Sequence, residues 1–189
     1  MEKLVLERPT IDRKDDAFNY LEENIKRNSD LNGTGNMDRC LKEMTYEEWL
    51  AELEKKKDIE YVKQRKRCLS ETFFVVRKQD NRIVGMVNIR HHISKEQIKS
   101  GVSHIGYGIR PTERRKGYAK MALYLALLEE QKLGEEKVLL ECTVDNIGSN
   151  KTIIALGGIL EKTELDKNDQ LMTNYYWINV KDSLKKYSK

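Results

Sequence analysis

The sequence has few cysteines and no long apolar run. Three of its 189 residues are cysteines, Cys40, Cys68 and Cys142, an odd number at wide spacing with no C-x-x-C pair. This pattern suggests neither a disulfide framework nor a zinc cluster, and it fits a reducing cytoplasm. No apolar run approaches the ~18 residues of a membrane helix, and the amino terminus is too short in apolar residues for a secretory signal. We therefore expect a cytoplasmic protein without a metal or a membrane span.

Two common phosphate-binding motifs are also missing. There is no G-x-x-x-x-G-K-[ST] loop, and Gly106-x-Gly108 is followed by Pro111 where a dinucleotide fingerprint needs its third glycine. The net charge is only +4, although charged residues make up 35% of the chain. Such a mild excess suits an anionic ligand, but it does not argue for nucleic acid or a membrane surface as partner. No internal repeat is present.

The length predicts one domain, residues 1–189, because domains usually contain about 100 to 200 residues. Apolar periodicity predicts strands at 4–6, 72–77, 83–89, 105–109, 138–144, 159–163 and 172–180. It predicts helices that begin near 10, 46, 118 and 150. The strands at 105–109 and 138–144 must run parallel, because a helix connects them in a right-handed unit.

Several finer expectations concern faces, caps and turns. The first helix is capped by Thr10 or Asp12 and buries a face with Phe18, Leu21 and Ile25. The helix after 118 buries a stripe of five residues, Tyr118, Met121, Ala122, Leu125 and Leu128. Ser149 caps the helix that follows, and residues 166–169 form a turn in the closing hairpin. His91 and His92 face opposite sides of a strand, and residues 55–67 form a solvated helix or connector.

The stretch around which the chain is organised runs from Arg114 to Lys120, between the strand at 105–109 and the helix. The first N–H groups of a helix lack intrahelical partners and carry the positive end of the macrodipole, so this turn predicts an anion site. Arg114, Arg115 and Lys116 add cations, and Gly117 lets the backbone approach a bulky anion.

The pattern Arg114-x-x-Gly117-x-Ala119 resembles the R-x-x-G-x-G/A signature of the GNAT superfamily of acyl-CoA-dependent N-acyltransferases. Asn146-x-x-Ser149 resembles the second family motif, and the two together are similar to a bacterial branch of predicted acetyltransferases. The resemblance implies an α/β (α+β) fold: a mixed, mostly antiparallel sheet of six or seven strands, with a central parallel pair splayed around the cofactor and helices on both faces.

The resemblance also implies acetyl-CoA as co-substrate and direct acyl transfer to an amine, without a covalent acyl-enzyme. The implied cofactor-binding residues are Tyr107, Gly108 and Ile109 on the strand, Arg114, Arg115, Lys116, Gly117, Tyr118, Ala119 and Lys120 in the turn, and Asn146 and Ser149 after the next strand.

The catalytic groups are less defined. His104 and Glu141 are candidates for the base that deprotonates the amine, although a structural role explains each more readily. Ile153 occupies the position where many family members have a tyrosine acid, so Tyr175 or Tyr176 could substitute, or water could protonate the thiolate. Cys142 is expected to be a core residue and not a nucleophile.

The sequence is compatible with three functions. The first is an N-acetyltransferase acting on a small molecule, peptide or protein, and the second is a non-catalytic acyl-CoA sensor, which the Ile153 position supports. Nucleic-acid binding through residues 55–67 ranks last. The acceptor site is expected at 28–39 and 171–176, where the loop at 28–36 is either a lid or a connector. A homodimer is compatible with the family.

Overall fold

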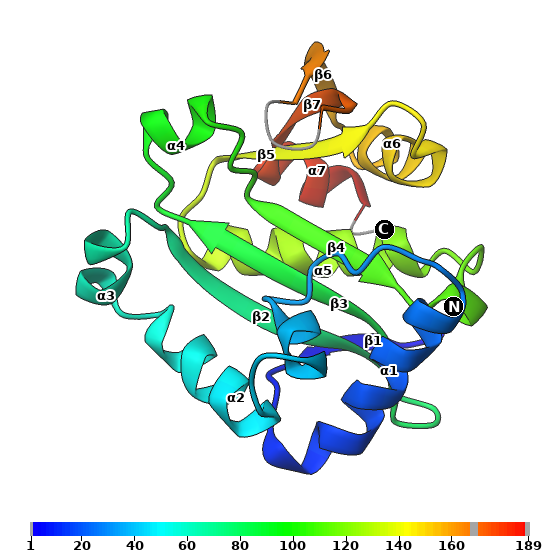
Figure 1. Ribbon diagram of the computed structural model, residues 1–189. Helices are drawn as coiled ribbons and strands as arrows, with labels where there is room; N and C mark the ends of the chain where they lie inside the picture. Colours follow the sequence, from blue (N-terminus) through cyan, green and yellow to red (C-terminus); the bar gives the residue numbers. More distant parts are fainter. Residues whose placement is uncertain (1, 167–169, 188–189) are drawn as a thin grey trace.

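The computed structural model describes residues 2–166 and 170–187 (Figure 1). Within this part of the chain, seven strands form two sheets, and every pair of hydrogen-bonded strands is antiparallel. The first sheet has the order β1-β2-β3-β4, with β1 Leu4–Glu7, β2 Leu69–Arg77, β3 Arg82–His91 and β4 Ile105–Ile109. The second has the order β5-β7-β6, with β5 Lys137–Thr143, β6 Ile159–Leu165 and β7 Met172–Asn179.

The two sheets meet at the start of β4 and separate toward its end. The His104 amide donates to the Leu139 carbonyl at 2.8 Å, and the Leu139 amide donates to His104 Nδ1 at 3.0 Å. Beyond this junction β4 and β5 share no ladder, although Figure 1 shows that both run in the same direction. The predicted parallel pair is therefore splayed, and its free edges bound a gap.

Helices cover both faces of the first sheet (Figure 1). One face packs on α5 Tyr118–Lys132, with α6 Ile147–Ala155 and α7 Val180–Tyr187 beside it. The other face packs on α1 Lys14–Lys26 and α2 Tyr46–Lys55. Leu123 and Leu127 of α5 are fully buried, and each contributes roughly 1.5–3 kcal/mol to folding. The fold class expected from the sequence is confirmed.

Shorter helices lie in the connections. They are η1 Ile11–Arg13, η2 Met37–Leu41, α3 Ile59–Gln64, α4 Lys95–Lys99 and η3 Pro111–Glu113. Two of the helices, α4 and α7, were not predicted from the sequence. Ser94 and Gln97 form a capping box that starts α4, and Val180, which was assigned to the last strand, is the first residue of α7. The predicted turn at 166–169 lies largely outside the described residues.

The predicted buried faces and caps need correction. Ile25 is half exposed, and α1 instead buries Tyr20 and Asn24. Neither Thr10 nor Asp12 caps α1, because η1 precedes it. The fully buried side of α5 is rotated from the predicted stripe, since it includes Leu123 and Leu127 while Met121, Leu125 and Leu128 are only partly buried. The rotation follows from packing on two sides, against the sheet and against α6 and α7.

The two adjacent histidines do not face opposite sides. His92 leaves β3 with φ of 54°, which turns its ring back so that the His91 and His92 Nδ1 atoms are 2.9 Å apart. The described residues nevertheless contain no group of three or more His, Cys, Asp or Glu side chains placed to hold a metal ion. Of the helices formed by residues 2–166 and 170–187, none has the length and apolar character needed to cross a membrane.

Candidate active site

The turn from β4 into α5 exposes backbone amides at the helix N-terminus. Arg115 and Gly117 both have left-handed φ values, 64° and 81°, and a Cβ added at Gly117 would meet no atom within 4 Å. The first intrahelical bond runs from the Met121 amide to the Gly117 carbonyl, so the amides of residues 118–120 point out of the helix end. This geometry creates a positive pole that is open to solvent.

A buried carboxylate holds the turn in place. Glu113 accepts from Lys116 Nζ at 2.7 Å and from Arg77 Nη1 at 2.8 Å. Burial alone would raise the pKa of Glu113, but the hydrogen bonds and charges of Lys116 and Arg77 outweigh it and hold the pKa below its usual value. Arg77 also donates to the hydroxyl of buried Tyr118. The contacts of Lys116 and Tyr118 with Glu113 and Arg77 therefore fix the conformation of the turn.

The other cationic side chains of the turn differ in whether they already have an interaction partner in the protein. Arg114 Nε donates to the Ile109 carbonyl at 3.0 Å, and its Nη2 donates to Ser29, so Arg114 ties the turn to β4 and to the loop after α1. Lys120 Nζ lies 4.6 Å from the ring centroid of Tyr187. Among the described residues, Arg115 has no ion-pair partner. Arg115 is thus the guanidinium of the turn that remains available to a ligand.

A cleft of about 470 Å³, called here the turn cleft, begins at this turn. Predicted cofactor residues from three separate segments line it, namely Tyr107, Gly108, Ile109, Arg114, Ala119, Asn146 and Ser149. Arg115, Lys116, Gly117, Tyr118 and Lys120 are not among its lining residues.

A second cleft of about 620 Å³, the gap cleft, lies where β4 and β5 separate. It shares Tyr107, Asn146 and Ser149 with the turn cleft, so the two are continuous. The Arg110 amide bonds the Val84 carbonyl of β3, and amides alternate along an antiparallel strand. The amides of Tyr107 and Ile109 therefore point to the opposite edge of β4, toward the gap.

A hydroxyl pair spans the gap cleft. Ser149 Oγ on α6 donates to the Tyr107 hydroxyl at 3.0 Å. Burial raises the pKa of Tyr107 to about 12, so the tyrosine keeps its proton at neutral pH. Both hydroxyls can donate or accept, so when Ser149 donates, the Tyr107 proton is free for another acceptor in the cleft.

Gly106 and Gly108 lie on β4 without a β-bulge. The register of β4 against β3 is continuous from Ile105 to Ile109. A Cβ on Gly108 would lie 2.7 Å from the Asn32 carbonyl oxygen, and one on Gly33 would lie 2.7 Å from the Gly106 carbonyl oxygen. Gly108 and Gly33 therefore have no room for a side chain, because the loop at 28–36 crosses β4 in direct backbone contact. This loop is a packed element and not a free connector.

The predicted catalytic residues occupy different places. Glu141 lines the gap cleft, is partly buried, and accepts from Ser103 Oγ at 3.3 Å. Tyr175, its partner across the β5–β7 ladder, donates to Asp166 Oδ2 at 3.0 Å, and Asp166 also lines the gap cleft. Burial raises the pKa of Tyr175, and the Asp166 carboxylate raises it further.

His104 and Tyr176 lie away from the clefts. His104 is buried in the junction between the sheets, where its Nδ1 accepts from Leu139, and burial lowers its pKa. Tyr176 faces the other side of β7 and donates to Asn150 Oδ1 at 2.6 Å. Ile153 is a core residue that contacts Gly158. Both His104 and Tyr176 thus make structural contacts that the sequence could not specify.

The segment after β5 is organised by Asn150, a role that was not predicted from the sequence. Its amide group donates to the carbonyls of Thr143, Val144 and Asn146, while its Oδ1 accepts from Asn174 and Tyr176. Asn146, and not Ser149, caps α6, because Asn146 Oδ1 accepts from the Ser149 amide at 3.1 Å. Ser149 is consequently left to bond Tyr107.

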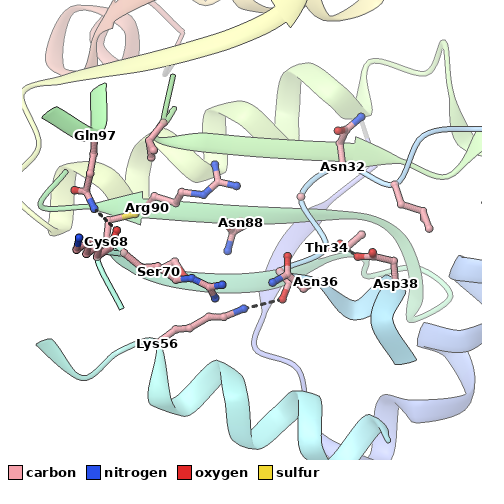
Figure 2. Close-up of a pocket in the computed structure, with 16 residues that line it drawn as sticks. Asn32, Thr34, Asn36, Asp38, Lys56, Cys68, Ser70, Asn88, Arg90 and Gln97 are labelled. Carbon is pink, nitrogen blue, oxygen red and sulfur yellow. Dashed lines mark hydrogen bonds between the residues drawn. The ribbon is translucent and has the colours of Figure 1, made fainter. Parts of the chain in front are cut away.

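A third cleft of about 580 Å³, the basic basin, continues from the gap cleft past Leu31, Asn32, Gly33 and Arg90, which line both. Figure 2 shows Lys56 and Arg90 extending into it over β2 and β3, with Asn88 on β3, the strand that also carries Arg90. Lys66 and Arg67 also line it. All three cations from the 55–67 segment were missed, because a run of charged residues in sequence is typical of a solvated surface.

Comparison with known proteins identifies the architecture. A model of the acetyltransferase (GNAT) family matches residues 41–157, which is more than half of the chain. No curated protein sequence is close enough to count as a relative.

Solved structures with the same fold are similar over nearly their whole length. A ribosomal-protein-S5-alanine acetyltransferase from Vibrio fischeri has a TM-score of 0.66 at 16% identity, with 96% of each chain covered. A spermidine/spermine N-acetyltransferase from Vibrio cholerae has a TM-score of 0.61 at 19% identity, with 98% of each chain covered. The microcin C7 self-immunity acetyltransferase, solved with acetyl-CoA and AMP, has a TM-score of 0.62 at 18% identity, covering 95% of this chain and 93% of that one.

Proposed function

The chain belongs to the acetyltransferase (GNAT) family, whose enzymes use acetyl-CoA as co-substrate, and on that premise we propose that it acetylates a primary amine by direct attack. The observation that carries the proposal is the continuity of the turn cleft, the gap cleft and the basic basin. Together the three clefts form one trough. An anionic cofactor would bind at the end that contains the turn, the acceptor would bind at the other end, and the two would react in the gap between them.

The cofactor end is assigned to the turn. Amides of residues 118–120 and the Arg115 guanidinium would hold the pyrophosphate, since both are open at the helix N-terminus. Arg114, Lys116 and Tyr118 shape the turn through their own contacts. Asn146 and Ser149, across the gap, would border the pantetheine arm.

Residues of the gap cleft supply the catalytic groups. Acetyl-CoA brings the activated acetyl group, and the outward amides of Tyr107 and Ile109 would stabilise negative charge that develops on the carbonyl oxygen. Glu141 is the proposed base, directly or through a water, because a primary amine must lose a proton before attack. Tyr107, oriented by Ser149, would donate its O–H to the departing sulfur.

Direct attack is favoured over a covalent acyl-enzyme. Cys142 is the cysteine of the gap cleft, and burial together with Glu141 raises the pKa of its thiol to about 11. At neutral pH the thiol is therefore almost entirely protonated, which is the weakly nucleophilic form.

Two measurements test this function. Calorimetry should detect acetyl-CoA binding to the wild type and its loss in Gly117→Glu, where a carboxylate enters the open turn; equal affinities would refute the assignment of the turn. Free-thiol release with a panel of amines should then fall at least about tenfold in Glu141→Gln at unchanged acetyl-CoA affinity. Tyr176→Phe, which alters a hydroxyl outside the trough, is the control and should keep its turnover.

A further inference from the structure

We propose that the basic basin binds an anionic group of the acceptor, so that the acetylated amine belongs to a molecule that also carries a carboxylate or a phosphate. This inference rests on the proposed acetyl transfer and adds the chemical class of the substrate. It follows from the charges that line the basin and from their lack of protein counterions.

Four cationic side chains and one carboxylate are found among the described residues that line the basin: Lys56, Lys66, Arg67, Arg90 and Asp38. None of the four cations forms an ion pair with a described carboxylate, although ion pairs are frequent elsewhere on this chain. Asp38 is already engaged, because it accepts from Thr34 Oγ1 at 3.0 Å. The basin therefore holds an uncompensated positive charge.

Lys56 makes this excess costly. The residue is only 7% exposed, and its Nζ has one hydrogen-bond acceptor among the described residues, the Gly35 carbonyl at 3.0 Å. Burial lowers the pKa of Lys56; Glu52 opposes this effect, and the nearby charges of Arg67, Arg39 and Arg90 add to it. A buried ammonium among other cations is unfavourable unless an anion joins them.

The position of the basin identifies which ligand the anion belongs to. The phosphates of the cofactor are assigned to the turn, at the other end of the trough, and the gap cleft lies between. Arg90 lines both the gap cleft and the basin, and one of its nitrogens is fixed by the Ser103 carbonyl at 3.0 Å. An anion in the basin would thus sit beside the gap where the amine reacts, which suits an acceptor with both groups.

The same lining disfavours a polycationic acceptor. A polyamine needs carboxylates along its path, whereas the basin offers cations and uncharged amides such as Asn88 and Gln97. A similar fold in a polyamine acetyltransferase therefore does not carry its substrate class to this chain.

Matched acceptors give the first test, with acetyl-CoA saturating and thiol release as readout. The pairs are ethanolamine with O-phosphoethanolamine, and the C-terminally amidated peptide Ala-Asn-Asn-Ala with amidated Ala-Asp-Asp-Ala. Amidated Ala-Lys-Lys-Ala and spermidine are the cationic acceptors. We expect kcat/KM at least about tenfold higher for the anionic member of a pair, with spermidine poorest. The phosphate and peptide pairs distinguish a phosphorylated small molecule from an acidic peptide. No preference for the anionic members would overturn the inference.

Variants of the basin give the second test. Arg67→Gln should raise KM for the preferred anionic acceptor about tenfold and leave KM for its neutral counterpart unchanged. The control is Lys63→Gln, which removes one charge from the same segment but outside the basin, where Lys63 pairs with Glu60. Equal effects of the two variants on the anionic acceptor would contradict the proposal.

A third variant separates binding from folding. Lys56→Met removes the buried ammonium, while the Gly35 carbonyl keeps the Trp49 indole as donor at 3.2 Å. We expect a variant at least as stable to urea as the wild type, with weakened binding of the anionic acceptor to the CoA-bound enzyme by calorimetry. Wild-type affinity for that acceptor would refute the basin's role.

The outcomes distinguish this inference from the proposed function. If acetyl-CoA binds and amines react without regard to their charge, only the anionic class is wrong. If acetyl-CoA fails to bind the wild type, the proposed function itself fails. If Arg67→Gln weakens acetyl-CoA binding, the basin serves the cofactor and the inference is also refuted.

Discussion

Gly33 should be among the least replaceable residues of the trough, and Gly33→Ala tests how the loop at 28–36 is held. Gly33 has φ of 73°, and a Cβ there would lie 2.7 Å from the Gly106 carbonyl oxygen, 2.8 Å from Tyr107 Cα and 2.9 Å from the Met86 carbonyl oxygen. All three atoms are backbone atoms of the central strands. Because no flexible side chain can move aside, the loop itself must shift away from β4.

The expected cost has two parts. A Cβ in the left-handed region costs about 1 kcal/mol, and forcing an extra methyl group into packed backbone adds about 1 to 3 kcal/mol. Gly134→Ala is the matched control, because Gly134 has φ of 84° but open space around its Cβ position. It carries the first cost alone, part of which is offset by the lower entropy of the unfolded chain.

Urea unfolding at equilibrium measures both variants. We expect Gly33→Ala to lower the unfolding free energy by about 2 to 4 kcal/mol and Gly134→Ala by at most about 1 kcal/mol. The loop borders all three clefts, so Gly33→Ala should also raise KM for the acceptor. Equal destabilisation by the two variants would show that the loop does not press on β4 as described.

Three further predictions follow from other contacts. Arg115→Gly removes the guanidinium, and glycine adopts the φ of 64° at this position without strain. The variant should bind acetyl-CoA about tenfold more weakly by calorimetry, and an unchanged Kd would contradict the assignment of Arg115 to the cofactor. Asn150→Leu should lower the unfolding free energy by about 2 to 4 kcal/mol, because the hydrogen bonds that its amide group makes with five residues are lost. Tyr176→Phe, which loses one of these bonds, should lower the unfolding free energy by about 1 kcal/mol, and similar losses in the two variants would argue against the network. Burial and Glu135 raise the pKa of Glu130, whose oxygens lack described hydrogen-bond partners, to about 9. Since this folded pKa lies above the unfolded value of 4.5, the contribution of Glu130 to stability should be complete below about pH 4.5 and be lost as pH rises toward 9, by at most about 1.4 kcal/mol per pH unit. Glu130→Gln should flatten the fall in stability between about pH 5 and 9, and parallel pH profiles of the variant and the wild type would refute the assignment.

The turn from Arg114 to Lys120 is the part of the candidate site whose geometry the sequence predicted best. Its signals are local, since a strand, a basic glycine turn and an amphipathic helix follow one another within thirty residues, roughly the length of a βαβ unit. The strand order around it was also readable, because alternation and turn residues act over short distances. The roles within the turn were not readable, because the engagement of Lys116 depends on Glu113 being buried and paired with Arg77.

The catalytic candidates show where local signals end. His104 and Glu141 were candidates for the base, Tyr175 and Tyr176 were candidates for the acid, and all four lie on or beside neighbouring strands. The direction and the hydrogen-bond partner of each side chain distinguish the residues that reach the gap cleft from those that do not. Tyr176 is hydrogen-bonded to Asn150 behind the sheet, and His104 is hydrogen-bonded to Leu139 in the junction between the sheets. Pairing of this kind joins residues 26 and 35 positions apart, and no periodicity encodes it.

By itself, the sequence determined the fold class and the basic glycine turn before α5, since both rest on short-range patterns of size, charge and backbone freedom. The tertiary structure alone decided that Lys56, Arg67 and Arg90 converge on one basin and that Tyr107 meets Ser149 across the gap. A charged run has the same composition whether it faces water or turns inward, and only the packing of α2 and α3 beside β2 and β3 brings its cations to the trough.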